Sequence, residues 1–222
     1  MEDKYEIENC AVAFIDILGC RDMMRKDSEE SLNRVHRIYV GACEGYKKFA
    51  NSQSLCMPDI KIFSDNIVLS INEDIHGEFA LSNLILAAAV FQLKFLEEGI
   101  LVRGGITKGD FFSDKIMLWG NALARAYQLE SELAIYPRII VDPKYALEFK
   151  ILPAIKNRKL IKEDIDGIHL INYLNLIYSL NAEECRKLIE ESNVLLVGLN
   201  NNDSKNQKLG WHKNYTSTYL CN

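Results

Sequence analysis

Two acidic residues occupy positions where a buried sheet would normally carry apolar or turn-forming side chains. Asp16 closes the apolar run Cys10–Ile17, which predicts a buried strand. Asp65 lies in the short turn between two further β-rich runs, Ile60–Phe63 and Ile67–Ile71, an arrangement that predicts a hairpin. In a β-α-β-β order the first strand lies beside such a hairpin. The sequence therefore predicts that both carboxylates meet at one edge of the sheet.

Two neighbouring carboxylates repel each other, so at neutral pH one of them would take up a proton. A divalent cation removes this conflict, and hard oxygen ligands in an incomplete protein shell suit Mg²⁺ or Mn²⁺ held jointly with substrate phosphates. Taken singly, Asp16 at a strand end or Asp65 in a turn is more often a cap or a turn former. The indication of a metal site comes from the pair in this strand order.

The elements that must position these acids alternate between helical and extended patterns. Helices are predicted over Ser28–Gln53, Glu78–Glu98 and Gly120–Ala134, and strands over Leu101–Phe112 and Arg138–Val141. The order up to Val141 is β-α-β-β-α-β-α-β, which predicts an α+β fold with a ferredoxin-like sheet.

After about residue 150 the pattern changes to a small accessory region. It predicts a hairpin around Asp166-Gly167, a helix over Ala182–Leu199, a solvated loop at Asn200–Asp203 and a tail that contains Trp211.

Composition limits the function. The 222 residues carry 26 Lys and Arg against 31 Asp and Glu, a formal charge of −5, which argues against binding to duplex DNA. The six cysteines show no metal-binding spacing and are expected to be reduced thiols. The N-terminus lacks an apolar signal core, and polar residues interrupt the apolar stretch Leu81–Leu96. We expect a cytoplasmic protein with neither a nucleic-acid nor a membrane partner.

Four segments in the correct order resemble motifs of class III nucleotidyl cyclases, the adenylate/guanylate cyclase catalytic domain. Residues Phe14–Cys20 resemble Phe-x-Asp-Ile-x-Gly-Phe, and Ile60–Asp65 is similar to Ile-Lys-x-x-Gly-Asp with Ser64 in place of Gly. Arg103–Gly109 resembles Arg-x-Gly-Ile-x-x-Gly, and Trp119–Glu130 resembles the helix motif that follows it. The resemblance covers residues 14 to 130 and implies a cyclase catalytic domain over residues 1–150, with residues 151–222 as an accessory hairpin and helices packed on it.

The resemblance also implies a set of site residues. Asp16, Asp65 and the Ile17 carbonyl would bind two Mg²⁺ or Mn²⁺ ions, which activate the ribose 3′-hydroxyl and stabilise the leaving pyrophosphate. Arg103 would pair with phosphate oxygens, although a salt bridge on the strand surface is the alternative. Backbone amides would hold the triphosphate, namely those of Leu18, Gly19 and Cys20.

The sequence departs from the family pattern in the second half of the site. The helix Asn and Arg of the family fall on Ala124 and Gln128, and Arg125 either replaces the missing guanidinium or is a solvated surface residue. Lys61 matches the purine-reading lysine, but Met117 stands where the family has an aspartate. Because Met accepts only weak hydrogen bonds, adenine recognition in the usual manner is not expected.

These departures, the compact chain and the Trp-containing tail resemble the pyrimidine cyclases of bacterial antiphage (Pycsar) systems. That resemblance implies conversion of UTP or CTP into cyclic UMP or cyclic CMP, a second messenger, by a homodimer with active sites at its interface. Tyr39 and Tyr46 would narrow the base pocket or belong to the core. Phe111-Phe112 would lie at the dimer interface or be buried. A catalytically inactive nucleotide-binding module and a purine cyclase are the alternative functions.

Overall fold

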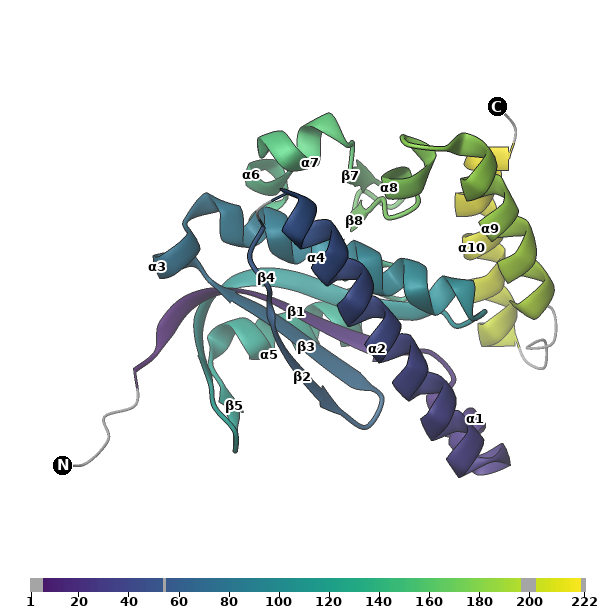
Figure 1. Ribbon diagram of the computed structural model, residues 1–222, viewed down its shortest axis with the longest axis horizontal. Coiled ribbons are helices and arrows are strands. Elements are labelled where there is room, and N and C mark those ends of the chain that lie inside the picture. The colour runs from purple at the N-terminus through teal and green to yellow at the C-terminus, as the bar shows by residue number, and fades with distance from the viewer. Residues whose placement is uncertain (1–5, 54, 197–202, 221–222) are drawn as a thin grey trace.

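The computed structural model describes residues 6–53, 55–196 and 203–220 of the chain. A twisted sheet lies at its centre, with the strand order β2-β3-β1-β4-β6-β8-β7, and β5 pairs with the end of β4 (Figure 1). The first part of this sheet, β2-β3-β1-β4, is antiparallel throughout, whereas β6 runs parallel to β4. This is the predicted ferredoxin-like α+β arrangement. The strands are β1 (Glu8–Ile17), β2 (Asp59–Phe63), β3 (Asn66–Asn72), β4 (Val102–Ser113), β5 (Leu118–Trp119), β6 (Ile139–Val141), β7 (Ile161–Glu163) and β8 (His169–Ile171).

The alternation of side chains along β1 divides the core into two layers. Ala11, Ala13 and Ile15 point to the face covered by the long helices α2 (Ser28–Gln53) and α4 (Glu78–Glu97). The intervening residues, such as Val12 and Phe14, point to the opposite face, on which α5 (Asn121–Gln128) packs. Asp16 continues the second series, so its side chain belongs to the α5 face at the end of the strand.

Helix α4 is the core helix of the molecule. Among the described residues it is the one helix long and apolar enough to cross a membrane, but 83% of its most apolar window is buried inside the protein. Its packing against α2, β3 and β1 accounts for that apolar composition. The buried Asn83 within it is partly satisfied, since its main-chain carbonyl accepts a hydrogen bond from the Tyr46 hydroxyl at 3.2 Å and its side-chain amide donates to Cys56 Sγ at 2.8 Å.

Helix α5 continues into a π-helical turn, η1 (Leu129–Leu133), where a single longer helix was predicted. The chain passes close to β4 at this point. A Cβ on Gly105 would lie 2.4 Å from the Leu129 Cβ and 2.6 Å from the Ala126 carbonyl oxygen. Gly105 therefore allows the helix to lie directly on the strand. The π turn then directs the side chain of Glu130 into the protein, where it is 3% exposed.

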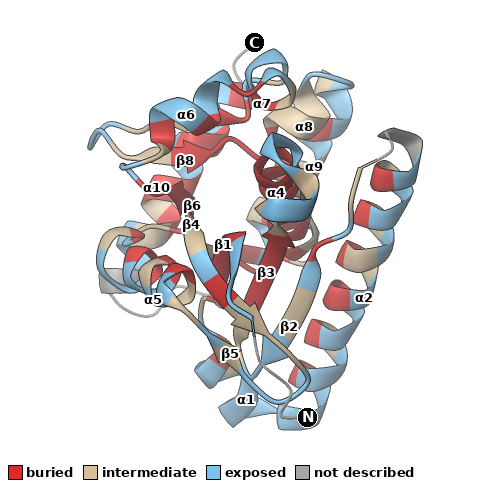
Figure 2. Ribbon diagram, turned by 90° about the vertical axis from the view of Figure 1, so that its left-hand side faces the viewer, coloured by how far each residue is buried: buried red, intermediate tan, exposed pale blue. Residues whose placement is uncertain are grey.

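The C-terminal part of the chain extends the sheet and caps one end of it. The hairpin β7–β8 was predicted, and it joins the main sheet through pairing of β8 with β6. Helices α9 (Ala182–Leu196) and α10 (Asp203–Leu220) contact each other beyond the end of α4 (Figure 1). Figure 2 shows that the central strand β3 is largely buried. The shorter helices are α1 (Cys20–Lys26), α3 (Glu73–His76), α6 (Ala146–Ile151), α7 (Pro153–Asn157) and α8 (Asn175–Tyr178).

The predictions for these regions have different outcomes. Helix α2 has the predicted bounds, and α4 ends one residue before the predicted Glu98. Helix α9 reaches Leu196, and the rest of its predicted extent, like most of the predicted loop at Asn200–Asp203, lies outside the described residues. The predicted tail is the helix α10.

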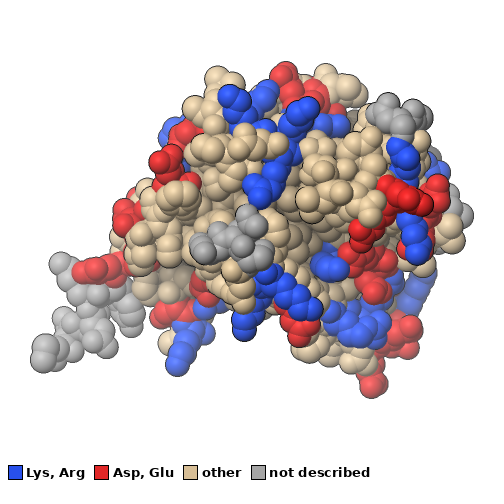
Figure 3. Space-filling view, turned by 45° about the horizontal axis from the view of Figure 1, so that its top comes forward, with Lys and Arg blue, Asp and Glu red and all other residues tan. Residues whose placement is uncertain are grey.

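The cysteines and the charged side chains can also be compared with the expectations from the sequence. The predicted free thiols are confirmed for Cys10, Cys20, Cys43, Cys56 and Cys185, whereas Cys221 lies outside the described residues. Positive and negative side chains are interspersed on the face shown in Figure 3.

Candidate active site

Asp16 and Asp65 are brought together by the pairing of β1 with β3. The Ile17 N–H donates to the Asp65 carbonyl at 3.0 Å, and Asp16 lies opposite Asn66 in the register of the two strands. The Asn66 side chain donates weakly to Asp65 Oδ1 at 3.4 Å. The turn between β2 and β3 places Ser64 at a φ of +56°, a left-handed conformation that glycine adopts without cost. The two acids thus lie at one edge of the sheet.

A buried ion-pair cluster surrounds Asp16. Arg103, its neighbour on β4, directs its Nε hydrogen to Asp16 Oδ2 at 3.3 Å. The same nitrogen lies 2.6 Å from Glu130 Oε1, a carboxylate whose side chain is only 4% exposed and which forms no well-aligned hydrogen bond there. Arg103 therefore balances two carboxylates, one at the predicted site and one behind it. Arg103 thus forms the salt bridge of the alternative interpretation, and its contact with phosphate stays a prediction.

Burial dominates the protonation behaviour of the cluster. It raises the pKa of Asp16, and the charge of Asp65 adds to that rise while Arg103 opposes it. Burial likewise raises the pKa of Glu130, with Asp16 adding to the effect and Arg103 opposing it. The acids repel each other across a small space, and one guanidinium compensates only part of that repulsion. Such a site gains from a further cation.

The donor set fits Mg²⁺ or Mn²⁺. Asp16 and Asp65 would supply hard carboxylate oxygens, and the Ile17 carbonyl remains the third predicted ligand. Within the described part of the chain, no group of three or more His, Cys, Asp or Glu side chains is arranged to hold a metal ion. Two carboxylates leave coordination positions for water and for substrate phosphates, as is usual for Mg²⁺ in nucleotide sites.

The segment after Asp16 is a tight turn that leads into α1. Gly19 adopts a φ of +81° before the first helical residue, Cys20, and its carbonyl accepts hydrogen bonds from the Asp22 and Met23 amides at 3.1 Å. The Leu18 amide donates to the Leu101 carbonyl at 2.9 Å. Leu18 is therefore already hydrogen-bonded, which leaves Gly19 and Cys20 as the amides of the predicted set for a phosphate in this conformation.

Lys61 on β2 lies beside the β4–β5 arm, which carries Met117. Lys61 Nζ is 3.4 Å from Asp59, which also accepts a hydrogen bond from Ser113 at 2.7 Å, so the β4–β5 arm crosses to β2 here. The Asp114 carboxylate in that arm accepts the amides of Ile116 and Met117, both at 2.7 Å. These bonds lower the pKa of Asp114, and the nearby charge of Lys61 adds a smaller effect.

Arg125 is held on the exposed side of α5 by a buried acid. Its guanidinium donates to both oxygens of Asp142, at 2.9 and 3.0 Å, and to the Gln128 side chain at 2.9 Å. Asp142 is 2% exposed, and its pKa is lowered because the hydrogen bonds from Arg125, Lys144 and Thr107 outweigh its burial. Arg125 is thus neither freely solvated nor part of the Asp16 cluster. It lies beside Gln128, where the family pattern places its arginine, while Ala124 is exposed.

Three aromatic predictions concern residues that the structure places elsewhere than in a base pocket or an interface. Tyr46 is fully buried and donates to the Cys56 carbonyl at 3.0 Å, and Tyr39 packs edge-on against Phe95. Both belong to the core. Phe111 is 2% exposed, so the alternative of simple burial applies to it as well.

Sequence reasoning assigned no role to Glu130, although it lies in the fourth motif, and none to Lys208 on α10. The only sequence signal for Glu130 was an acid directly after a buried leucine in a helical pattern. Lys208 had no local signal, since its proximity to Asp16 depends on the packing of α10.

Comparison with solved structures identifies the architecture. The adenylyl cyclase CyaB from P. aeruginosa is similar over 76% of this chain and 95% of its own, with a TM-score of 0.52 and 15% identity. An adenylate/guanylate cyclase/hydrolase from Silicibacter pomeroyi is similar over 76% of this chain and 96% of its own, with a TM-score of 0.51 and 17% identity. The chain has the class III cyclase fold. No protein-family model matches the sequence, and no curated protein matches it. The cyclase fold is thus recognisable in three dimensions at identities of 17% and below.

Proposed function

We propose that this protein is a metal-dependent pyrimidine nucleotide cyclase that converts UTP or CTP into the 3′,5′-cyclic nucleotide and pyrophosphate. The observation that carries the proposal is the juxtaposition of Asp16 and Asp65 beside Arg103 at one sheet edge. In the reaction the ribose O3′ forms a bond to the α-phosphorus, the hydroxyl proton is lost, and the bond to the bridging oxygen breaks. Bound Mg²⁺ or Mn²⁺ would lower the pKa of the hydroxyl and neutralise charge on the phosphates.

The chain's own residues would orient the substrate for this in-line attack. Asp16 and Asp65 fix the position of the cation, and Arg103 has a planar guanidinium that can turn from Asp16 to phosphate oxygens once a cation compensates the acid. Glu130 remains as the second partner of Arg103 and limits how far it moves. Holding the ribose and the triphosphate in one geometry can supply up to about 7–11 kcal/mol of the barrier.

The pyrimidine assignment is supported by Met117. This residue stands where the family pattern has a purine-reading acid, its side chain is exposed, and Asp114 uses Oδ1 to accept backbone amides instead. A purine cyclase is the second candidate, because Lys61 remains close to two acids, Asp59 and Asp114. A cyclic pyrimidine nucleotide would serve as a second messenger in the cytoplasm. We propose that this signal acts in antiphage defence.

The proposal includes a homodimer that shares its active sites. Phe63 and Tyr127, 47% and 54% exposed, flank the buried Phe14 at ring distances of 6.3 and 5.4 Å. We call Phe14, Phe63 and Tyr127 the aromatic patch. It lies on the side of the sheet opposite α2 and α4, and its Tyr127 comes from α5, the helix that also carries Arg125. A partner that covers this patch would bring its own α5 toward the sheet edge that carries Asp16. The partner's α5 would then supply the ribose and base contacts that a single protomer lacks.

The test is a parallel assay of ATP, GTP, UTP and CTP with Mn²⁺ or Mg²⁺, with the products identified by mass spectrometry. We expect cyclic UMP or cyclic CMP and an equal amount of pyrophosphate. Asp16→Asn and Asp65→Asn should each lower turnover by roughly several hundred-fold while the protein stays folded by circular dichroism. Cyclic AMP or cyclic GMP as the main product would favour the purine candidate. Unchanged turnover in either variant would refute the metal assignment.

A further inference from the structure

Helix α10 is anchored to the end of the sheet by aromatic side chains at helical spacing. Trp211 Nε1 donates to Asp164 at 2.8 Å, and the hydroxyls of Tyr215 and Tyr219 donate to the Asn172 side chain at 3.1 and 2.6 Å. The rings of Trp211 and Tyr215 stack with centroids 5.4 Å apart. These contacts fix the helix relative to the β7–β8 hairpin. A side chain one turn before Trp211 is therefore presented from a rigid support.

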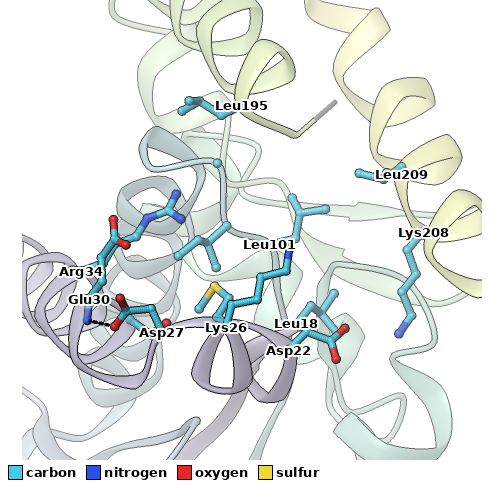
Figure 4. Close-up of a pocket in the computed structure, with 15 residues that line it drawn as sticks. Leu18, Asp22, Lys26, Asp27, Glu30, Arg34, Leu101, Leu195, Lys208 and Leu209 are labelled. Carbon is cyan, nitrogen blue, oxygen red and sulfur yellow. Dashed lines mark hydrogen bonds between the residues drawn. The ribbon is translucent and has the colours of Figure 1, made fainter. Parts of the chain in front are cut away.

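Lys208 is that side chain, and it extends toward the sheet edge that carries Asp16. It lines a cavity of about 380 Å³ together with Leu18 and Gly19, the residues that follow Asp16 and Ile17. Figure 4 shows the Lys208 side chain extending from α10 toward Leu18 and Asp22 across this cavity. The cyclase turn and the C-terminal helix thus form two walls of one space.

The charges around Lys208 are those of the candidate active site. Burial lowers the pKa of Lys208, as does the positive charge of Arg103, whereas Asp16 and Glu130 raise it. Lys208 is half-buried, and it forms no ion pair with any residue that the structure describes. Its ammonium is consequently close enough to the cluster to feel its charges but is not bound to any one carboxylate.

Two other charged residues of the cavity wall serve local structure. Asp27 accepts the Glu30 amide at the start of α2, and Arg34 donates to the Glu98 carbonyl. Lys26 and Asp22 lie on the short helix α1, and Figure 4 shows the Lys26 side chain pointing into the cavity and Asp22 beside Leu18. Lys208 is the lysine that α10 contributes to the cavity wall, opposite Leu18 and Gly19.

We propose that Lys208 binds the polyphosphate end of the nucleotide substrate, so that α10 adds a phosphate contact from the protomer that carries Asp16 and Asp65. This inference rests on the proposed function. A lysine ammonium is a compact point charge that binds phosphate oxygens without demanding one orientation. A triphosphate held at Asp16 and Asp65 by cations would carry its terminal phosphates past Leu18 and Gly19. It would reach Lys208 there, and the same contact would stabilise the departing pyrophosphate.

The experiment compares Lys208→Ala, Lys208→Arg and the matched control Lys213→Ala, which removes an exposed lysine from the same helix. Isothermal titration with pyrophosphate in the presence of Mn²⁺ measures phosphate binding without turnover, and titration with uridine or cytidine measures base and ribose binding. We expect Lys208→Ala to weaken pyrophosphate binding at least about tenfold, with Lys208→Arg within about threefold of the unsubstituted protein. Nucleoside binding, and all properties of Lys213→Ala, should stay unchanged.

Other outcomes of these measurements separate the phosphate site at Lys208 from the proposed cyclase activity. Equal pyrophosphate affinity for Lys208→Ala and the unsubstituted protein would overturn the inference. If the unfolding temperature of Lys208→Ala falls while that affinity stays the same, Lys208 is a purely structural counter-ion and the inference is likewise wrong. Pyrophosphate binding that depends on Lys208, in a protein that makes no cyclic nucleotide from any of the four triphosphates, would support the phosphate site while refuting the cyclase.

Discussion

At the scale of single residues, the candidate site is a balance of charges. Arg103 contacts Asp16 at 3.3 Å and Glu130 at 2.6 Å, and both acids are mostly buried. The Arg103 guanidinium therefore lies between Asp16, which the proposed chemistry needs, and Glu130, which the sheet and the π turn enclose. Metal binding at Asp16 would relieve the shortage of positive charge, and Glu130 would then keep Arg103 in place.

This charge balance predicts how substitutions of Arg103 affect stability. Arg103→Met leaves two neighbouring carboxylates without their counter-ion and should lower the free energy of unfolding by about 2–4 kcal/mol at pH 7.5. Adding Glu130→Gln in that background should recover part of the loss, because it removes one of the two uncompensated charges. Urea unfolding of the single and double variants measures both effects. If the double variant is less stable than Arg103→Met, the charge-balance account is wrong.

At the scale of elements, close packing positions Glu130. Gly105 on β4 lets Ala126 and Leu129 approach the strand backbone, and the π turn that follows points Glu130 inward. The geometry of the ion-pair cluster therefore depends on a glycine that is not itself charged.

Gly105→Ala tests this dependence. The new methyl group would collide with backbone and with the Leu129 side chain, so α5 would shift and unfolding free energy should fall by about 1–3 kcal/mol. Because the shift moves Glu130 away from Arg103, cyclase turnover should fall as well. The matched control is Gly41→Ala in α2, whose added Cβ meets nothing within 4 Å and should stabilise the helix by about 0.5–1 kcal/mol. Equal effects of the two substitutions would contradict the proposed role of the close approach.

Helix α10 contains a buried histidine that makes stability depend on pH. His212 is fully buried, neither ring nitrogen has a hydrogen-bond partner among the described residues, and burial lowers its pKa to about 4. Between pH 6.5 and 4 the unfolded chain takes up a proton at this residue that the folded protein does not. Acidification over that window should therefore cost up to about 3 kcal/mol of stability through His212 alone.

His212→Phe should remove this part of the pH dependence. Urea unfolding at pH 7.5 and at pH 4.5 would show a smaller loss of stability for His212→Phe than for the unsubstituted protein. His36→Gln, at an exposed position of α2, is the control and should follow the unsubstituted protein. The same pH dependence in all three proteins would exclude His212 as its source.

Local sequence patterns were sufficient to predict the elements that pack directly against the main hydrophobic core. The apolar alternation of β1 and the periodic apolar residues of α2 and α4 predicted these elements within two residues. Helix α10 was not predicted because its segment is polar overall, although Trp211, Tyr215 and Tyr219 recur at every fourth residue. Its support comes from Asn172, about forty residues earlier, which no local pattern shows.

The residues of the candidate site divide in the same way, into those that local patterns predict and those that depend on the tertiary structure. Asp16, Asp65 and Arg103 come together because adjacent strands carry them, and strand order was readable from the sequence. Glu130 depends on a π turn and Lys208 on the docking of a remote helix, so both required the tertiary structure. The short helices α7 and α8 likewise hold their places through contacts with the helices α4 and α9.

At the scale of the whole molecule, the distribution of the site residues favours a shared active site. Arg125 is bound to Asp142 and Gln128 on α5, whereas Asp16 is bound to Arg103 at the strand end. No described contact joins Arg125 to the acids within one protomer. The aromatic patch, whose Tyr127 lies on the same helix as Arg125, is the surface that we propose for a second copy of the chain.

Complementation between two inactive variants tests this arrangement. Asp16→Asn removes a proposed metal ligand, and Arg125→Ala removes the guanidinium that we expect to act on the substrate held by the partner, so each variant alone should have little activity. In a mixture, half of the dimers would contain one protomer of each kind, and one of the two sites in such a dimer would have both Asp16 and Arg125. Turnover should therefore recover to about a quarter of that of the unsubstituted protein after subunit exchange, with the dimer confirmed by sedimentation velocity. A mixture that stays inactive although the subunits exchange would show that Asp16 and Arg125 do not serve one site across a dimer interface.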